Sequence, residues 1–166
     1  MEQITLNAIR DNAEQTEHNF FSDDFALIMD SAYLGRQFIT LNQPYQEQGG
    51  RLLRVLSGEA TYNINMENSV LRPNMVIFVP DGSIVEIRGY SDDYRAQVMP
   101  ILDMPAERTQ HDPLCLQLSQ QDGSRIGHYF QLAWEIVHKP RYSLDTLRFL
   151  QMALLNDLKN IELTEP

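Results

Sequence analysis

Up to about residue 101, hydrophobic and polar positions alternate in short runs, which is the pattern of β-strands and not of helices. Turn-forming residues separate these runs, at Gly49-Gly50, Ser57-Gly58, Arg72-Pro73-Asn74 and the segment 80–83. The run 75–79 (Met-Val-Ile-Phe-Val) has no polar position, so we expect a strand that is buried on both faces. Many short strands without helices between them predict an antiparallel sandwich or barrel.

From about residue 124 onward the hydrophobic period becomes that of a helix. Ser124 is placed to cap a first helix that runs to about His138, where Lys139-Pro140 ends it. Ser143 can cap a second helix, and hydrophobic residues recur there every three or four positions, at Leu144, Leu147, Leu150, Leu154, Leu158 and Ile161. This stripe is broad, so we expect it either to be sandwiched inside its own domain or to face a second subunit.

Composition narrows the class of protein. A chain of 166 residues with 43% hydrophobic and 22% charged residues suits one globular domain spanning 1–166. Its formal net charge of −10 argues against nucleic-acid binding by this segment alone, because phosphate binding needs clustered Lys and Arg. No apolar run approaches the roughly 20 residues of a membrane span. The single cysteine, Cys115, fits a reducing compartment, so we expect a cytoplasmic protein.

Chemical motifs are scarce. The four histidines, His18, His111, His128 and His138, show no His-x-His or His-x-x-x-His spacing, so we expect no metal site. The Gly-x-Ser-x-Gly elbow, the dinucleotide fingerprint and the phosphate-binding loop are also absent from the sequence. We therefore expect a protein without catalytic residues or cofactor.

An ordered series of short motifs resembles the cupin-like sensor domain of AraC-type transcription regulators. The series consists of residues 53–60 (Leu-Arg-Val-Leu-Ser-Gly-Glu-Ala), residues 62–65 (Tyr-Asn-Ile-Asn) and residues 71–83, which contain Leu-Arg-Pro-Asn and Pro-Asp-Gly-Ser. The resemblance extends over roughly residues 20–160. It implies a mainly β fold: a cupin-type double-stranded β-barrel (jelly roll) over about 20–101, then a C-terminal α-helical hairpin over about 124–161.

Two departures from known patterns refine this resemblance. Catalytic cupins carry metal-binding histidines on barrel strands, whereas the corresponding strands here read Leu52-Leu53-Arg54 and Ile84-Val85-Glu86. This favours a sensor over an enzyme. The helix-turn-helix DNA-binding domain of the family normally follows the dimerisation helices, and this sequence reaches Glu165-Pro166 where the linker would begin. We therefore expect either a segment of a regulator or a stand-alone sensor domain.

The resemblance implies a homodimer that binds an unidentified small-molecule effector in the barrel and passes the signal to a DNA-binding domain. The helical hairpin would form the dimer interface through Leu147, Leu150, Leu154 and Leu158. Polar residues on the predicted strands are the candidates for ligand contact: Gln43, Arg54, Tyr62, Glu86, Arg95 and Gln97. Of these, Arg54 and Arg95 would suit a carboxylate or phosphate.

Two alternatives remain open at this point. The chain is a dimerisation module without ligand if residues 52–56 and 75–79 fill the barrel completely. It is a metal-free cupin isomerase or epimerase if an acid and a base face each other across the interior, with His111 or Tyr62 pointing into a wet cavity.

Overall fold

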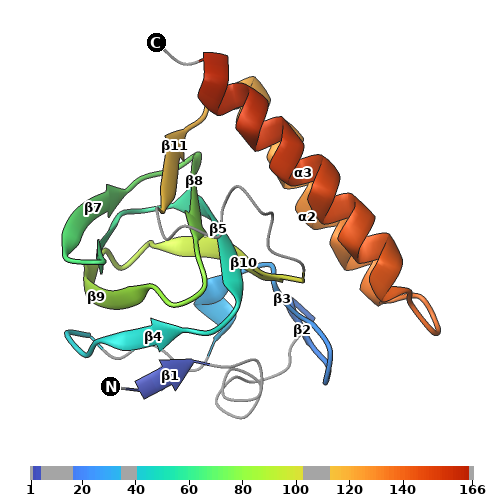
Figure 1. Ribbon diagram of the computed structural model, residues 1–166, viewed down its shortest axis with the longest axis horizontal. Coiled ribbons are helices and arrows are strands. Elements are labelled where there is room, and N and C mark those ends of the chain that lie inside the picture. Colours follow the sequence, from blue (N-terminus) through green and yellow to red (C-terminus); the bar gives the residue numbers. More distant parts are fainter. Residues whose placement is uncertain (1, 5–16, 35–40, 103–112, 165–166) are drawn as a thin grey trace.

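Two β-sheets face each other in the computed structural model, which describes residues 2–4, 17–34, 41–102 and 113–164 (Figure 1). The five-stranded sheet has the order β1 (Glu2–Ile4), β4 (Tyr45–Glu47), β9 (Ile84–Tyr90), β6 (Ala60–Ile64), β7 (Glu67–Leu71). The six-stranded sheet has the order β11 (Leu114–Gln117), β8 (Met75–Val79), β5 (Gly50–Ser57), β10 (Arg95–Ile101), β3 (Ala26–Ile28), β2 (Asn19–Phe21).

The chain crosses repeatedly from one sheet to the other. It passes from β4 to β5, from β7 to β8, and from β9 to β10, each time changing sheets. Within the described residues, the pairing of β1 with β4 is parallel and the other strand pairings are antiparallel. This is the jelly-roll arrangement of a cupin-type barrel, so the predicted fold class is confirmed.

The six-stranded sheet is covered on both faces. On β8, Val76 and Phe78 pack toward the helices, whereas Ile77 and Val79 pack into the space between the sheets. All four side chains are buried. The expectation that the run 75–79 is buried on both faces is thereby confirmed for these four residues, and Met75 at its start is half-buried.

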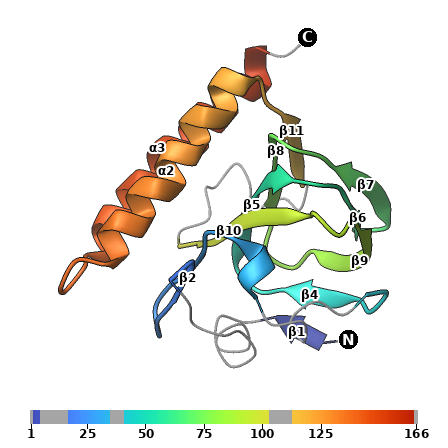
Figure 2. The same ribbon diagram turned by 180° about the vertical axis from the view of Figure 1, so that it is seen from behind.

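Two antiparallel helices, α2 (Gln120–Val137) and α3 (Leu144–Thr164), lie side by side along the outside of this sheet (Figures 1 and 2). The cap predicted at Ser124 is wrong, because Ser119 caps α2 by accepting a hydrogen bond from the Asp122 N–H at 3.1 Å. Ser143 caps α3 as predicted, accepting from the Thr146 N–H at 3.2 Å. Neither helix combines the length and hydropathy that a bilayer span requires.

Polar contacts join α3 to its neighbours. Asp157 accepts hydrogen bonds from Arg125 and Tyr129 of α2. The buried Gln151 donates to the Pro100 carbonyl at 2.7 Å and accepts from the Leu102 N–H at 3.0 Å. The second contact ties the middle of α3 to the end of β10.

The face of α3 predicted to form a dimer interface points into the protomer. Leu147, Leu150, Leu154 and Leu158 are all buried, in the core shared by the two helices and the six-stranded sheet. Side chains already covered by their own chain cannot contact a second copy, so the predicted interface residues need correction. The large exposed hydrophobic residues of α3 are Phe149, at 70% exposure, and Met152, at 63%.

Candidate functional site

The space between the two sheets holds a cavity of about 50 Å³. Its wall is mainly apolar and comes from both sheets and from the 3₁₀ turn η1 (Ser31–Tyr33), with the lining residues Ile28, Ser31, Leu34, Tyr45, Glu47, Arg51, Leu53, Tyr62, Val79, Val85, Ile87, Tyr94, Ala96 and Val98. A neighbouring cavity, also of about 50 Å³, shares part of this wall and extends it to Ala26, Gln48 and Pro100. This interior space is the candidate functional site.

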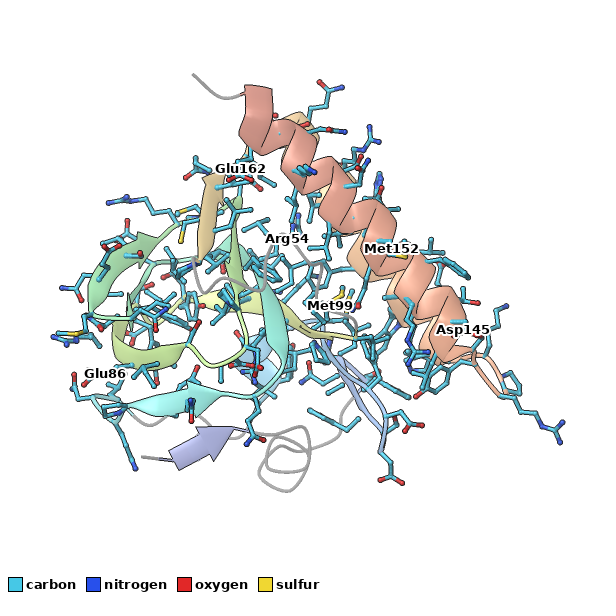
Figure 3. The ribbon with its side chains drawn as sticks, in the orientation of Figure 1. Arg54, Glu86, Met99, Asp145, Met152 and Glu162 are labelled. Carbon is cyan, nitrogen blue, oxygen red and sulfur yellow. The ribbon has the colours of Figure 1, made fainter. Side chains whose placement is uncertain are left out.

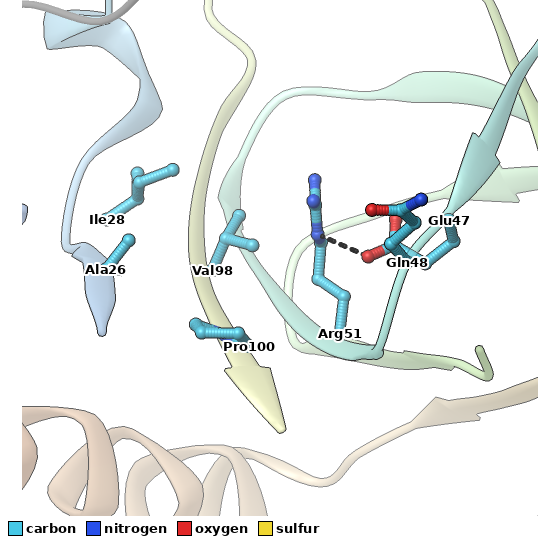
Figure 4. A pocket seen from close by; sticks show the side chains of 7 residues that line it. All are labelled: Ala26, Ile28, Glu47, Gln48, Arg51, Val98 and Pro100. Atoms are coloured by element: carbon cyan, nitrogen blue, oxygen red, sulfur yellow. Dashed lines mark ion pairs between the residues drawn. The ribbon is translucent and has the colours of Figure 1, made fainter. Parts of the chain in front are cut away.

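One charged pair stands in the apolar wall. Glu47 of β4 and Arg51 of β5 line both cavities, with the Arg51 Nε 3.2 Å from the Glu47 Oε1 (Figure 4). The side chain of Glu47 is 2% exposed and that of Arg51 is 12% exposed. The turn between the end of β4 at Glu47 and the start of β5 at Gly50 brings the two side chains together.

Burial changes the acidity of Glu47. Loss of water raises its pKa to about 7, and the nearby Asp81 carboxylate adds to the rise, although Arg51 opposes it. The other carboxylate oxygen, Oε2, is buried and has no hydrogen-bond partner among the described residues. A buried acceptor without a donor is costly, so this oxygen is a place where a bound molecule would gain a hydrogen bond.

Three tyrosines supply hydroxyl groups to the same cavity. Tyr62 and Tyr94 lie with their hydroxyl oxygens 3.2 Å apart, and Tyr45 lines the wall beside Glu47. Burial raises the pKa of Tyr94 to about 12, and it also raises the pKa values of Tyr45 and Tyr62. All three hydroxyls are therefore neutral near pH 7 and can donate hydrogen bonds as well as accept them.

Of the six predicted ligand residues, only Tyr62 lines this cavity. Arg54 lies on the opposite face of the six-stranded sheet, toward the helices (Figure 3). Its Nη1 donates to the Oε1 of Gln97 at 2.9 Å. Gly127 of α2 leaves room for this guanidinium, because a Cβ there would lie 2.9 Å from Nη2. Burial lowers the pKa of Arg54.

The other three predicted residues are engaged elsewhere or exposed. Arg95 forms a two-pronged ion pair with Asp30, which also caps η1, so Arg95 holds this turn at the cavity wall. Glu86 pairs with Arg88 at 3.2 Å on the outer face of β9. Gln43 is exposed just before β4.

Apart from Tyr62, the residues that form the polar part of the cavity were not among the ligand residues predicted from the sequence. Tyr45 and Glu47 belong to the segment Tyr-Gln-Glu-Gln between Pro44 and Gly49. This segment is a strand in the structure, but its polar sequence is typical of a loop. Arg51 lies in a run that is hydrophobic at both parities. Only a known register would have revealed which side chains share a face: Arg51, Leu53 and Val55 face the interior, and Leu52 and Arg54 face the helices.

Within residues 2–4, 17–34, 41–102 and 113–164, no three His, Cys, Asp or Glu side chains come together as a metal would require. His111, named above as a possible catalytic residue, lies outside the described residues.

Comparison with known proteins identifies the fold. No family model and no curated protein matches the sequence. Among solved structures, the chain is similar to apo ToxT K231A from Vibrio cholerae, with a TM-score of 0.51 and 10% identity, over 84% of this chain and 57% of that one. The chain thus spans little more than half the length of the ToxT structure. Such low identity shows a shared fold alone.

Two further structures show weaker likeness. A glyoxylate-induced protein from Pseudomonas aeruginosa has a TM-score of 0.38 and 12% identity, over 68% of this chain and 50% of that one. The plu4264 protein from Photorhabdus luminescens has a TM-score of 0.34 and 11% identity, over 60% of this chain and 85% of that one. At these scores neither likeness carries an argument about this chain.

Proposed function

We propose that this chain is the effector-sensing and dimerising part of an AraC-type transcription regulator and has no catalytic activity of its own. The observation that carries the proposal is a cavity inside the barrel with a polar corner formed by Glu47 and Arg51. Strand β10, which forms part of the cavity wall, is hydrogen-bonded to α3. The fold shared with ToxT, an AraC-family regulator, supports the same interpretation.

Strand β10 offers a physical route from the cavity to the helices. Val98 and Pro100 line the cavity, and the Pro100 carbonyl accepts a hydrogen bond from Gln151 of α3. A ligand that displaces this strand would favour one position of α3 over another. Signalling then follows from the difference in ligand affinity between the two positions.

Dimerisation is the second part of the proposal. The exposed Phe149 and Met152 lie one turn apart on α3 and therefore on the same face of the helix. A second copy of the chain would cover them through a symmetric contact. DNA binding would belong to another part of the regulator, because the net charge of −10 repels phosphate.

Filling the cavity tests the sensor proposal. Val98→Leu adds one methylene to the wall of a space of only about 50 Å³, whereas Val70→Leu makes the same change on the exposed face of β7. We expect a metabolite panel to contain a compound that raises the melting temperature of the wild type and of Val70→Leu. The same compound should leave Val98→Leu unchanged. An equal rise in all three proteins would place binding outside the barrel and refute the proposal.

The small cavity favours one alternative. Pockets for drug-sized ligands measure on the order of 300–1,000 Å³, many times the volume of about 50 Å³ found here. A barrel this full suits a dimerisation module without ligand. That function would be supported if no compound in the panel changed the melting temperature while the protein remained dimeric.

A metal-free isomerase is the other candidate. It is favoured by the observation that Glu47 and Tyr62, two groups that can exchange protons, line the same cavity. A carboxyl group with a pKa of about 7 can exchange protons in both directions near neutral pH. Recovery of the bound compound separates the two functions. A sensor returns it chemically unchanged after hours of incubation, as judged by NMR, whereas an isomerase returns a mixture.

A further inference from the structure

The polar corner formed by Glu47 and Arg51 carries one negative and one positive charge and contains one carboxylate oxygen that accepts no hydrogen bond from any described residue. Figure 4 shows the ion pair facing the apolar side chains of Ile28 and Val98 across the cavity. The two opposite charges cancel, and the nearby Asp81 is exposed, so water screens its contribution. The Glu47 Oε2 remains without a donor within the described part of the chain.

Both components of the pair restrict what can bind. An anion would be repelled by the Glu47 carboxylate, and a cation would be repelled by the Arg51 guanidinium, in a site where little water screens either charge. A neutral group can donate to the unpaired Oε2 and accept from an N–H of Arg51 or from a tyrosine hydroxyl.

We propose that the corner formed by Glu47 and Arg51 binds the polar end of a small uncharged ligand that carries both a hydrogen-bond donor and an acceptor, as a hydroxyl or a carboxamide does. The apolar remainder of the ligand lies against Ile28, Val98 and Pro100. The inference rests on the proposed ligand site and replaces the expectation of a carboxylate or phosphate. Of the arginines behind that expectation, Arg54 lies outside the cavity and Arg95 is bound to Asp30.

Three isosteric probes test the charge of the ligand directly. Acetamide, acetate and acetamidinium each have four non-hydrogen atoms, a size that matches a space of about 50 Å³, given that one water molecule needs about 10–15 Å³ of such space. Binding is followed at pH 8.5 by chemical-shift changes of the Val98 and Arg51 amides. At this pH Glu47 is ionised, because its pKa is about 7.

In the wild type we expect acetamide to bind with a dissociation constant at least tenfold below those of acetate and acetamidinium. Glu47→Gln leaves a net positive corner, so acetate should become the preferred probe. The double substitution Glu47→Gln with Arg51→Gln leaves a neutral corner and should restore the preference for acetamide. This order of preference follows from charge alone and does not depend on absolute affinity.

The outcomes also separate this inference from the proposed function. Preferred binding of acetate by the wild type, or the same order of probes in Glu47→Gln, would overturn the ligand class and leave a barrel ligand site intact. Absence of shifts with all three probes, beside metabolite binding that Val98→Leu abolishes, would likewise overturn the inference alone. Metabolite binding that Val98→Leu leaves unchanged would overturn both.

Discussion

Glu47 is a carboxylate that the fold holds away from water beside a single cation. Its pKa in the folded protein is about 7, against 4.5 in an unfolded chain. Between these two values the native state binds the proton and the unfolded state does not, so the free energy of unfolding falls as pH rises. The stabilisation is fully present below pH 4.5 and is lost as pH rises through 7, and its size is on the order of 3 kcal/mol.

We therefore predict that Glu47→Gln flattens the dependence of stability on pH. Urea denaturation at several values between pH 5 and 8.5 should show the wild type losing about 3 kcal/mol more than the variant. Glu86→Gln is the matched control, because Glu86 lies on the outer face of β9 in an ion pair with Arg88. The control should retain the wild-type slope. Parallel curves for wild type and Glu47→Gln would contradict the assignment of a buried, weakly acidic carboxyl.

The sequence predicted that arginine and tyrosine side chains would line the ligand site, but for most of them it did not predict which face of the sheet they occupy. Tyr62, one of the six candidates for ligand contact, lines the cavity, but Arg54 and Gln97 lie on the helix side of β5 and β10. The reason is physical: a strand buried on both faces is apolar at both parities, so its pattern does not tell which face is which. Glu47 was missed because a buried charge in a short strand looks like a solvent-exposed loop residue.

Among the elements, the turn between β5 and β6 has a strict requirement. Gly58 has a φ of 72°, and a Cβ added there would lie 2.5 Å from the Tyr94 backbone nitrogen. The close approach lets the Ser57 hydroxyl donate to the Asp93 carbonyl at 2.6 Å and so joins this turn to the one before β10. Any side chain at Gly58 must push the two turns apart.

We predict that Gly58→Ala destabilises the fold far more than Gly82→Ala. Gly82 has a φ of 84°, but nothing lies within 4 Å of its added Cβ, so that variant measures backbone strain alone. Strain of this kind costs about 1–2 kcal/mol, and the steric clash at Gly58 should add about 1–3 kcal/mol more. Urea denaturation midpoints with equal slopes would provide the comparison. Equal losses in the two variants would show that the turns separate without cost.

Elements with a clear hydrophobic period were predictable, and those without one were not. The pattern gave β5, β6, β8, β9, β10 and both helices approximately, whereas β1, β2, β4, β7 and β11 were missed. The missed strands are short, and β4, β7 (Glu67–Leu71) and β11 (Leu114–Gln117) each have a single buried residue. Their conformation comes from pairing with a long neighbour, which a single sequence does not display.

In the molecule as a whole, the six-stranded sheet connects two different cores. One core fills the barrel around Leu53 and Ile77, and the other joins the outer face of the sheet to α2 and α3 through residues such as Leu52 and Phe78. Neighbouring residues of one strand belong to different cores, so only the thickness of a single sheet separates the barrel core from the helices. This arrangement suits a sensor whose ligand and partner surfaces lie on opposite sides of one sheet.

The same arrangement yields a prediction about assembly. Leu154 is buried in the helix-side core, so Leu154→Ala should lower the free energy of unfolding by about 2–5 kcal/mol without changing the mass of the folded species. Phe149→Ser with Met152→Ser removes only exposed hydrophobic surface. The double variant should halve the mass measured by light scattering and keep the circular dichroism of the wild type. A dimeric mass in the double variant would place the interface elsewhere, and a monomeric wild type would remove dimerisation from the proposed function.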